Sequence, residues 1–382
     1  MIDDQGPMAN SPQVFRQSIP WKVKVFLLKR YKRLLTTSPP HFSTFILRSL
    51  LALGSYLYRL IFQGWFFLYR AGIFKSKKLP CKVISVGNIT VGGTGKTPAV
   101  ETIARMCAAA GRSPVILSRG YGRQQKSICI GSAKTSFREV GDEPILLARK
   151  LRGIPVVVGQ DRFEAGLEAL QTFRPQVLIL DDGFQHLRLE RDLDLVLIDA
   201  TDPFGQGHLL PRGFLREPLE NLSRADLFLI TRSDEGKPLE EIRQTLRALN
   251  PEAPIWVSGH LFYTVRKFQD SLEISPSSLS NKKILAFAGI GNPQSFLSSL
   301  RKAGLSPIHF LEFPDHYPYS REELKRIEDL ALKLQVEYIL TTEKDEVRME
   351  GFKPRTDKFY TGVIRLEIFQ AEEFQRFLLS KV

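Results

Sequence analysis

The sequence contains few cysteines, no repeats of fixed period and no low-complexity tracts. Its three cysteines, Cys81, Cys107 and Cys129, are odd in number and widely spaced. This arrangement argues against a disulfide framework or a paired metal knuckle, and it favours a reducing setting. With 382 residues, of which 43% are hydrophobic and 25% charged, the chain is long enough for two ordinary globular domains.

Acidic residues are nearly missing from the first eighty positions. Residues 1–80 hold thirteen Lys or Arg but only Asp3 and Asp4, so this segment carries +11 of the net charge of +13. The rest of the chain is close to neutral. The basic character therefore belongs to one segment, which argues against nucleic acid as a partner and favours an anionic membrane surface.

A long uninterrupted apolar run is also missing. Between Phe42 and Phe74, Arg48, Arg59 and Arg70 enclose two uncharged runs of ten residues each. A run of ten helical residues is too short to span a hydrocarbon core of roughly 30 Å. The spacing of eleven places the three arginines along one face of a continuous helix. We therefore expect this helix to lie in the plane of a membrane.

A second basic segment precedes this helix. WKVKVFLLKRYKRLL, residues 21–35, predicts a helix with an apolar stripe opposite its lysines and arginines, as expected at an anionic lipid surface. A signal peptide and a buried core helix are the alternatives. The interrupted apolar stretch and the lack of a small-residue cleavage site argue against a signal peptide. Packing of this region on the following domain stays open.

The segment CKVISVGNITVGGTGKTPAVETIARMCAAAG, residues 81–111, predicts a buried strand, a glycine-rich loop and a helix. Such a loop turns backbone N–H groups toward phosphate oxygens, and the start of the helix adds its positive dipole end. We expect Lys96 to reach the outer phosphates and the Thr97 hydroxyl to bind Mg²⁺. The predicted ATP-binding residues are Thr90, Val91, Gly92, Gly93, Thr94, Gly95, Lys96 and Thr97.

The loop departs from the standard phosphate-binding motif at one position. Thr90 stands where that motif has glycine, which lowers the specificity of the pattern. Val91 stands where the partition-type ATPases have an additional lysine, which argues against those families. A flexible turn without ligand is the alternative, and the preceding strand, the Lys-Thr pair and the following helix argue against it.

An acidic strand end accompanies the loop. In VLILDDGFQH, Asp181 and Asp182 follow four apolar residues, and we expect one of them to hold Mg²⁺ directly or through water. An acidic turn at the end of a parallel strand is the alternative. The apolar segments LDLVLIDA and ADLFLITRSD predict two further strands of the same sheet.

These elements predict an α/β protein with three parts. Residues 1–80 form a basic amphipathic membrane-associated segment. Residues 81–250 form a P-loop NTPase-like core with a parallel sheet. Residues 251–382 form a smaller α/β domain that closes on the active site, because KKILAFAGIGNPQSFLSSLRKAG again reads as strand, glycine turn and helix.

The chain resembles the tetraacyldisaccharide 4'-kinases, the lipid A 4'-kinases. The resemblance covers about residues 83–345 and is carried by the segments VGNITVGGTGKTP, SRGYGR, VGDEP, DDGFQH, PRGFLREP, FPDHYPYS and TTEKD, in this order. It implies transfer of the ATP γ-phosphate to the 4'-hydroxyl of tetraacyldisaccharide 1-phosphate, with ATP and Mg²⁺ bound. It also implies a peripheral or monotopic protein at the cytosolic face of the bacterial inner membrane. No obligate protein partner is evident.

The resemblance also implies roles for individual residues. Asp142 in VGDEP is expected to accept the proton of the attacking hydroxyl, with His316 in FPDHYPYS as its partner. By residue type alone, an Asp before Glu-Pro is most often a helix cap, and a His such as His316 is more often a hydrogen-bonded loop residue than a catalyst. Glu143 and Asp182 are further candidates for the metal or its waters. The pair requires the second domain to fold against the first.

Four arginines are candidates for contact with the 1-phosphate or the transferred phosphoryl group. They are Arg119, Arg123, Arg212 and Arg216. Ordinary surface ion pairing is the alternative for each of them.

A different function class competes with the kinase. Thr231, Arg232, Ser233 and Asp234 loosely resemble the Thr-Lys-x-Asp sequence of guanine recognition, which would fit a membrane-associated P-loop GTPase or ATPase switch. The arginine at the second position weakens this match. A lipid-binding scaffold with a degenerate nucleotide loop is a third possibility, and the intact Lys96 argues against it.

Overall fold

A computed structural model describes residues 42–121, 123, 127–132, 135–236 and 238–382. Within these residues, thirteen strands form one continuous sheet, with β9 (Glu273–Ile274) paired to β8 outside the main strand order. The order is β11-β10-β12-β13-β8-β7-β6-β1-β5-β2-β4-β3. The predicted basic helix at residues 21–35 lies outside the described residues.

The first half of the sheet is parallel except at its outer edge. Its strands are β1 (Lys82–Asn88), β2 (Pro114–Ser118), β3 (Cys129–Gly131), β4 (Val156–Val158), β5 (Val177–Asp181), β6 (Leu193–Asp199) and β7 (Leu227–Thr231). Only β3 runs antiparallel to its neighbour, β4. Strands β5, β6 and β7 are buried along their whole length. This explains their continuous apolar sequences, because helices cover both faces of such a sheet.

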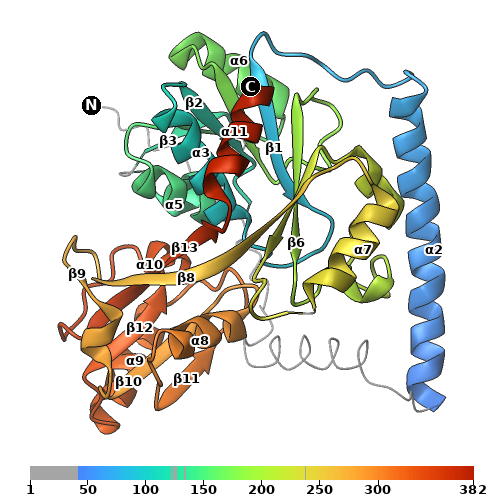
Figure 1. The fold of residues 1–382 in the computed structure, drawn as a ribbon. Helices are drawn as coiled ribbons and strands as arrows, with labels where there is room; N and C mark the ends of the chain where they lie inside the picture. The colour runs from blue at the N-terminus through green and yellow to red at the C-terminus, as the bar shows by residue number, and fades with distance from the viewer. Residues whose placement is uncertain (1–41, 122, 124–126, 133–134, 237) are drawn as a thin grey trace, which may run out of the picture.

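The second half joins the first without a break in the sheet. Its strands are β8 (Ile255–Lys267), β10 (Ile284–Ala288), β11 (His309–Glu312), β12 (Tyr338–Thr342) and β13 (Phe359–Ile368). The start of β8 pairs parallel with β7, and the remainder pairs antiparallel with β13. The long strands β8 and β13 therefore connect the two halves, as Figure 1 shows.

Helices cover the faces of both halves of the sheet. They are α3 (Lys96–Ala109), α4 (Phe137–Val140), α5 (Asp142–Lys150), α6 (Arg162–Phe173), α7 (Leu239–Leu249), α8 (Pro293–Lys302), α9 (Arg321–Lys333), α10 (Glu343–Arg348) and α11 (Ala371–Lys381). Three short 3₁₀ helices span Gly205–Gly207, Leu219–Arg224 and Pro276–Leu279.

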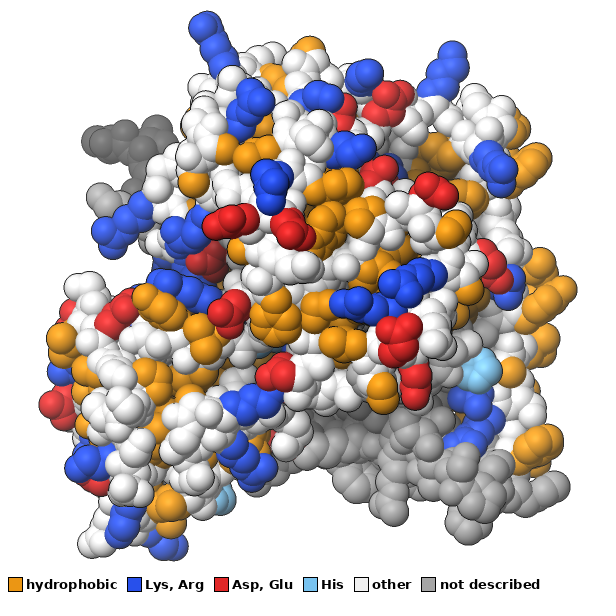
Figure 2. All heavy atoms as spheres, in the orientation of Figure 1, with side chains coloured by type: hydrophobic (Ala, Val, Ile, Leu, Met, Phe, Trp, Pro, Cys, Tyr) orange, Lys and Arg blue, Asp and Glu red, His pale blue; other side chains and the backbone are white. Residues whose placement is uncertain are grey.

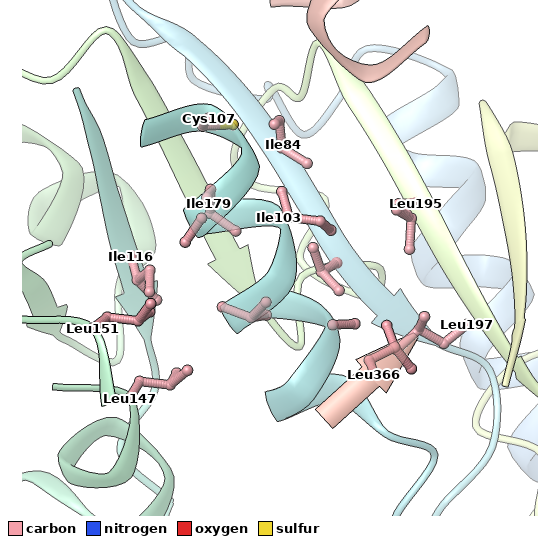
Figure 3. Close-up of a cluster of buried hydrophobic side chains, with 14 of the residues drawn as sticks. Ile84, Ile103, Cys107, Ile116, Leu147, Leu151, Ile179, Leu195, Leu197 and Leu366 are labelled. Atoms are coloured by element: carbon pink, nitrogen blue, oxygen red, sulfur yellow. The ribbon is translucent and has the colours of Figure 1, made fainter. Parts of the chain in front are cut away.

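The core of the first half includes residues from the end of the chain. Ile103 and Cys107 of α3 pack over Ile84 of β1, and Leu366 of β13 lies beside Leu197 of β6 in the same cluster (Figure 3). Phe374 of α11 is fully buried in the same cluster. The last helix therefore returns to the nucleotide half. The boundaries predicted at residues 80 and 250 remain predictions.

A single long helix, α2 (Phe42–Arg70), stands along one side of the molecule (Figure 1). Both ten-residue apolar runs belong to it, and Phe45–Arg70 is long and apolar enough to cross a membrane by length and composition. Each run by itself is too short for a span, whereas the whole helix is long enough. Whether α2 crosses or lies on a membrane depends on its contacts with the body.

One side of α2 packs against the body of the protein, by which we mean the sheet with its covering helices and loops. Ser55 Oγ donates to Leu209 O over 2.8 Å, Tyr58 Oη donates to Arg216 O over 2.6 Å, and Arg59 pairs with Glu220 at 2.9 Å. Arg59, one of the three arginines expected along one face of the helix, thus faces the body. The outward side is apolar, and its exposed side chains include Leu50, Leu53, Leu57 and Ile61. Figure 2 shows hydrophobic side chains along the edge where α2 lies.

Candidate active site

A cavity of about 450 Å³ lies where the two halves of the sheet meet. The first half contributes the glycine-rich loop, the strand end with Asp181 and Asp182, and Glu143 at the start of α5. The second half contributes His316 and Lys344. Residues predicted from separate sequence segments therefore share one cavity.

The glycine-rich loop adopts the predicted strand-loop-helix arrangement. Gly92 and Gly95 have φ values of 119° and 88°, which are strained for other residues, and Gly95 immediately precedes α3. Residues 92–97 line the cavity. Thr90 and Val91 lie before this lining, where Val91 N donates to Phe214 O over 2.8 Å. Thr90 and Val91 therefore anchor the glycine-rich loop to neighbouring segments of the protein.

Lys96 reaches toward the acidic strand end. Its Nζ donates to Asn88 Oδ1 over 3.2 Å and lies 3.6 Å from Asp182 Oδ1. Asn88 in turn donates to Thr90 O over 2.7 Å. The end of β1 therefore holds both the loop and its lysine, so a cation is placed beside the helix N-terminus that receives phosphate.

The segment 231–234, which loosely resembles a guanine-recognition sequence, contacts the glycine-rich loop. Thr231 Oγ1 donates to Thr94 O over 3.0 Å, and Arg232 donates to Gly93 O and pairs with Asp199. These contacts fix the glycine-rich loop from the neighbouring strand.

Asp234, the last residue of that segment, also forms an ion pair. Asp234 pairs with Lys302 of α8 at 2.6 Å. The side chain that would read guanine is thus bonded to the second half, and this favours the kinase over the GTPase.

Asp181 and Asp182 have contrasting electrostatic environments. Burial, together with the nearby Glu143 and Asp182 carboxylates, raises the pKa of Asp181 to about 7. Burial also opposes ionisation of Asp182, but Lys96 and Arg216 outweigh it and lower its pKa. Arg216 Nη1 lies 2.8 Å from Asp182 Oδ1. Asp182 is therefore neutralised by protein cations, whereas Asp181 is not.

The buried oxygens of Asp181 fit a divalent cation. Its Oδ2 accepts from Ser118 over 3.1 Å, while its buried Oδ1 has no hydrogen-bond partner among the described residues. Thr97 and Glu143 line the same cavity. Mg²⁺ usually takes one or two protein oxygens together with phosphate and water. No cluster of three or more His, Cys, Asp or Glu side chains that could hold a metal ion occurs in the part of the chain that the structure describes.

Asp142 and His316 form a direct pair across the two halves. His316 Nδ1 lies 2.8 Å from Asp142 Oδ2, and Arg348 Nε lies 3.1 Å from the same oxygen. Burial disfavours the Asp142 carboxylate, but the His316 hydrogen bond and the Arg348 charge outweigh burial and lower its pKa to about 2. The hydrogen bond to Asp142 raises the pKa of His316. His316 has a φ of 56°, a strained conformation that often marks functional sites.

The four candidate arginines separate into two groups. Arg119 and Arg216 line the cavity. Arg123 lies outside the lining and donates to Ser127 O and Val158 O. The Arg212 backbone N donates to Ser55 Oγ of α2, and Arg212 also lies outside the lining. The structure thus brings Arg119 and Arg216, but not the other two, to the phosphate loop.

Comparison with known proteins decides the family. A family model described as tetraacyldisaccharide-1-P 4'-kinase matches residues 47–382. The tetraacyldisaccharide 4'-kinase of Desulfatibacillum aliphaticivorans is 41% identical over 343 residues, covering 87% of this chain and 92% of that protein. The corresponding kinase of Syntrophus aciditrophicus is 42% identical over 294 residues, covering 74% and 79% of the two chains. The chain belongs to the tetraacyldisaccharide 4'-kinase family.

A solved structure agrees with this family. The apo-form LpxK of Aquifex aeolicus, described as a complex with ATP, has a TM-score of 0.70 and 33% identity, covering 88% of this chain and 99% of that chain. The predicted α/β fold, the kinase activity and the binding of ATP are therefore confirmed for this tetraacyldisaccharide 4'-kinase family member.

Several cavity residues of this kinase were not identified from the sequence. Lys344 pairs with Glu143 at 2.5 Å, and Lys150 bridges Glu101 and Glu343 at 2.8 and 2.9 Å. Lys344 belongs to TTEKD, one of the segments that carry the family resemblance, and this was the available signal. Lys150 is the last residue of α5 and lies in a basic stretch, so nothing in the sequence marked its bridging role.

Proposed function

We propose that this chain transfers the γ-phosphate of ATP to the 4'-hydroxyl of tetraacyldisaccharide 1-phosphate. The observation that carries this proposal is the shared cavity, in which the glycine-rich loop and His316 face one space and Asp142 lies directly behind His316. Phosphoryl transfer needs phosphate binding, charge neutralisation and an oriented acceptor, and this cavity supplies groups for all three.

The glycine-rich loop binds the donor. Backbone N–H groups of residues 92–97 and the start of α3 stabilise the phosphate oxygens. Lys96 moves from Asn88 and Asp182 onto the outer phosphates and neutralises charge during transfer. Because Arg216 already neutralises Asp182, the departure of Lys96 leaves no unpaired buried charge.

Thr97 and Asp181 are the residues that would hold Mg²⁺, with Glu143 and Asp182 close enough to orient its waters. The ion supplies charge neutralisation at the β- and γ-phosphates when bound. The raised pKa of Asp181 supports this assignment, because a carboxylate surrounded by other carboxylates is stabilised by a cation.

Asp142 and His316 activate the acceptor. The 4'-hydroxyl loses its proton as its oxygen bonds to the γ-phosphorus, and Asp142 accepts this proton while His316 orients the carboxylate. Arg119 and Arg216 line the cavity and are placed to bind the transferred phosphoryl group or the 1-phosphate of the acceptor. Arg123 and Arg212 contribute to this function through the loops that they hold.

Helix α2 would place the enzyme on the membrane that contains its substrate. Its apolar outer side faces away from the body, whereas Arg59 pairs with Glu220 on the inner side. Crossing the bilayer with these contacts intact would draw the charged Glu220 and Arg216 region into hydrocarbon, at a high cost. We therefore infer that α2 lies at the cytosolic face of the inner membrane, among anionic lipids.

The proposal is tested by a nucleotide comparison. Purified protein is mixed with tetraacyldisaccharide 1-phosphate micelles and either γ-labelled Mg-ATP or γ-labelled Mg-GTP. We expect label in the lipid with ATP, and its loss in a Lys96→Ala variant, by a factor of about 10² or more. Hydrolysis of GTP without lipid, and no labelled lipid with ATP, would instead establish a nucleotide switch.

A further inference from the structure

Arg348 lies behind the Asp142–His316 pair and outside the cavity lining. It is the last residue of α10, and its side chain is only 2% exposed. Its Nε lies 3.1 Å from Asp142 Oδ2, and its Nη1 donates to Gly289 O over 2.7 Å. The guanidinium therefore connects the start of α5 to the loop after β10.

Arg348 also lies beside a buried carboxylate, that of Asp345. Its Nη1 lies 3.4 Å from Asp345 Oδ1. Asp345 is fully buried and accepts hydrogen bonds from Gly289 N, Tyr319 Oη and Thr342 Oγ1 at 3.0, 2.8 and 2.6 Å. A guanidinium fixed by a buried carboxylate and a backbone carbonyl loses little further freedom when it contacts a third group.

Asp142 depends on the second half of the molecule for its orientation. Its Oδ1 accepts from the adjacent Glu143 N over 3.0 Å, whereas His316 and Arg348 both contact Oδ2. Gly141, just before it, has a φ of 96°, so the chain turns sharply into α5. The rotation of the carboxylate is thus set by two side chains that come from the other half.

We propose that Arg348 is a positioning residue that orients Asp142 for the acceptor proton, without touching either substrate. This inference rests on the proposed function of Asp142. His316 is hydrogen-bonded to Asp142 Oδ2, and Arg348 forms an ion pair with the same oxygen. A carboxylate has further lone pairs for the hydroxyl proton. A misplacement of about 1 Å in such a group can cost roughly 10² in rate.

The experiment must distinguish a role of Arg348 in stability alone from its proposed role in positioning Asp142. Removing one member of a buried ion pair destabilises a protein even when the pair has no catalytic role. Arg355 provides a control, because it also belongs to the second half and pairs with the buried Glu328 at 2.9 Å, although its own side chain is 49% exposed. Its carboxylate partners are Glu328 and Asp329 and not Asp142, and it lies outside the cavity lining.

The first measurement is steady-state lipid phosphorylation by the full chain. Arg348→Met should lower kcat by roughly 10²-fold with KM for ATP unchanged, because donor binding involves the glycine-rich loop and not Asp142. Arg348→Lys restores a positive charge near Asp142 and should recover most of the loss. Arg355→Met should keep kcat at the native value. A native kcat in Arg348→Met would overturn the inference.

A double-mutant cycle then tests whether Arg348 acts through Asp142. In an Asp142→Asn background, Arg348→Met should cause no further decrease in kcat, because the group that it positions no longer accepts the proton. An equal decrease in both backgrounds would overturn the inference while leaving the role of Asp142 intact. If the Met variants do not fold, Arg348→Gln, which also removes the charge, carries the same cycle.

Failure of the proposed role of Asp142 and failure of the proposed role of Arg348 would give different results. A native kcat in Asp142→Asn alone would refute the proposed proton acceptor, and with it the role of Arg348. A strongly impaired Asp142→Asn variant combined with independent effects of Arg348 would refute only the positioning role. Affinity for ATP without lipid, measured by calorimetry, should be the same in all of these variants.

Discussion

At the scale of single residues, the site depends on one carboxylate that is buried and still ionised. Asp142 is 5% exposed, yet His316 and Arg348 keep its pKa low. Burial alone would favour the neutral acid, which could not accept a proton. The neighbouring cations therefore maintain the protonation state that the proposed reaction needs.

The first prediction concerns Asp142. An Asp142→Asn substitution keeps the shape of the side chain but removes its capacity to accept the proton. We expect kcat to fall by roughly 10²- to 10⁴-fold while the affinity for ATP is retained. Kinetics with the lipid acceptor, together with nucleotide titration, measure both quantities. Turnover within threefold of the native value would remove Asp142 from the mechanism.

The second prediction concerns His316. Asp142 stabilises the protonated imidazole, so the pKa of His316 is raised above its ordinary value of 6.5. The stabilisation that this pair gives to folding is fully present below pH 6.5 and is lost as the pH rises through the raised pKa. An NMR titration should show this raised pKa, and Asp142→Asn should lower it. A pKa at or below 6.5 in the native protein would contradict the pairing.

Residue types that act locally could be predicted from the sequence. Lys96 and Thr97 follow a glycine-rich loop and Asp181 ends an apolar strand, so local order was enough to propose them as site residues, and all three line the cavity. Residues that act through distant contacts could not be identified in this way. Arg348 meets Asp142 across 206 positions of the chain, and no local pattern encodes that contact.

At the scale of elements, α2 differs most from its expected form. The sequence predicted a helix with basic and apolar sides, and the helix and its apolar side were found. The pairing of Arg59 with Glu220 was not predicted, because Glu220 lies 161 positions away in the chain. Periodicity shows which residues share a side of a helix, but it does not show which side the body covers.

The third prediction tests the outward side of α2. Replacing Leu50, Leu53, Leu57 and Ile61 by Gln should greatly reduce binding to vesicles that contain anionic lipid, because the replaced side chains are exposed and apolar. Thermal stability should change little. Vesicle sedimentation measures the bound fraction.

A matched control uses exposed apolar side chains of the second half. Leu272 and Ile308 are 54% and 53% exposed, and their replacement by Gln should leave vesicle binding unchanged. Equal binding by the α2 variant and the native protein would show that another surface attaches the enzyme to the membrane.

At the scale of the whole molecule, the site exists because one sheet continues through both halves. Strands β8 and β13 carry the second half beside the glycine-rich loop, and α11 returns to pack Phe374 against the first half. The two α/β halves could be read from the sequence. The continuous sheet could not, because the pairing of β8 with β13 joins segments about a hundred residues apart.

The measurement that tests the central claim most directly is the position of the transferred phosphate. Tetraacyldisaccharide 1-phosphate is incubated with the full chain and Mg-ATP, and the product is analysed by phosphorus NMR. The account predicts a second phosphate monoester, attached to the 4' carbon, and none in an Asp142→Asn sample over the same time. A diphosphate at position 1, or inorganic phosphate with unchanged lipid, would contradict it.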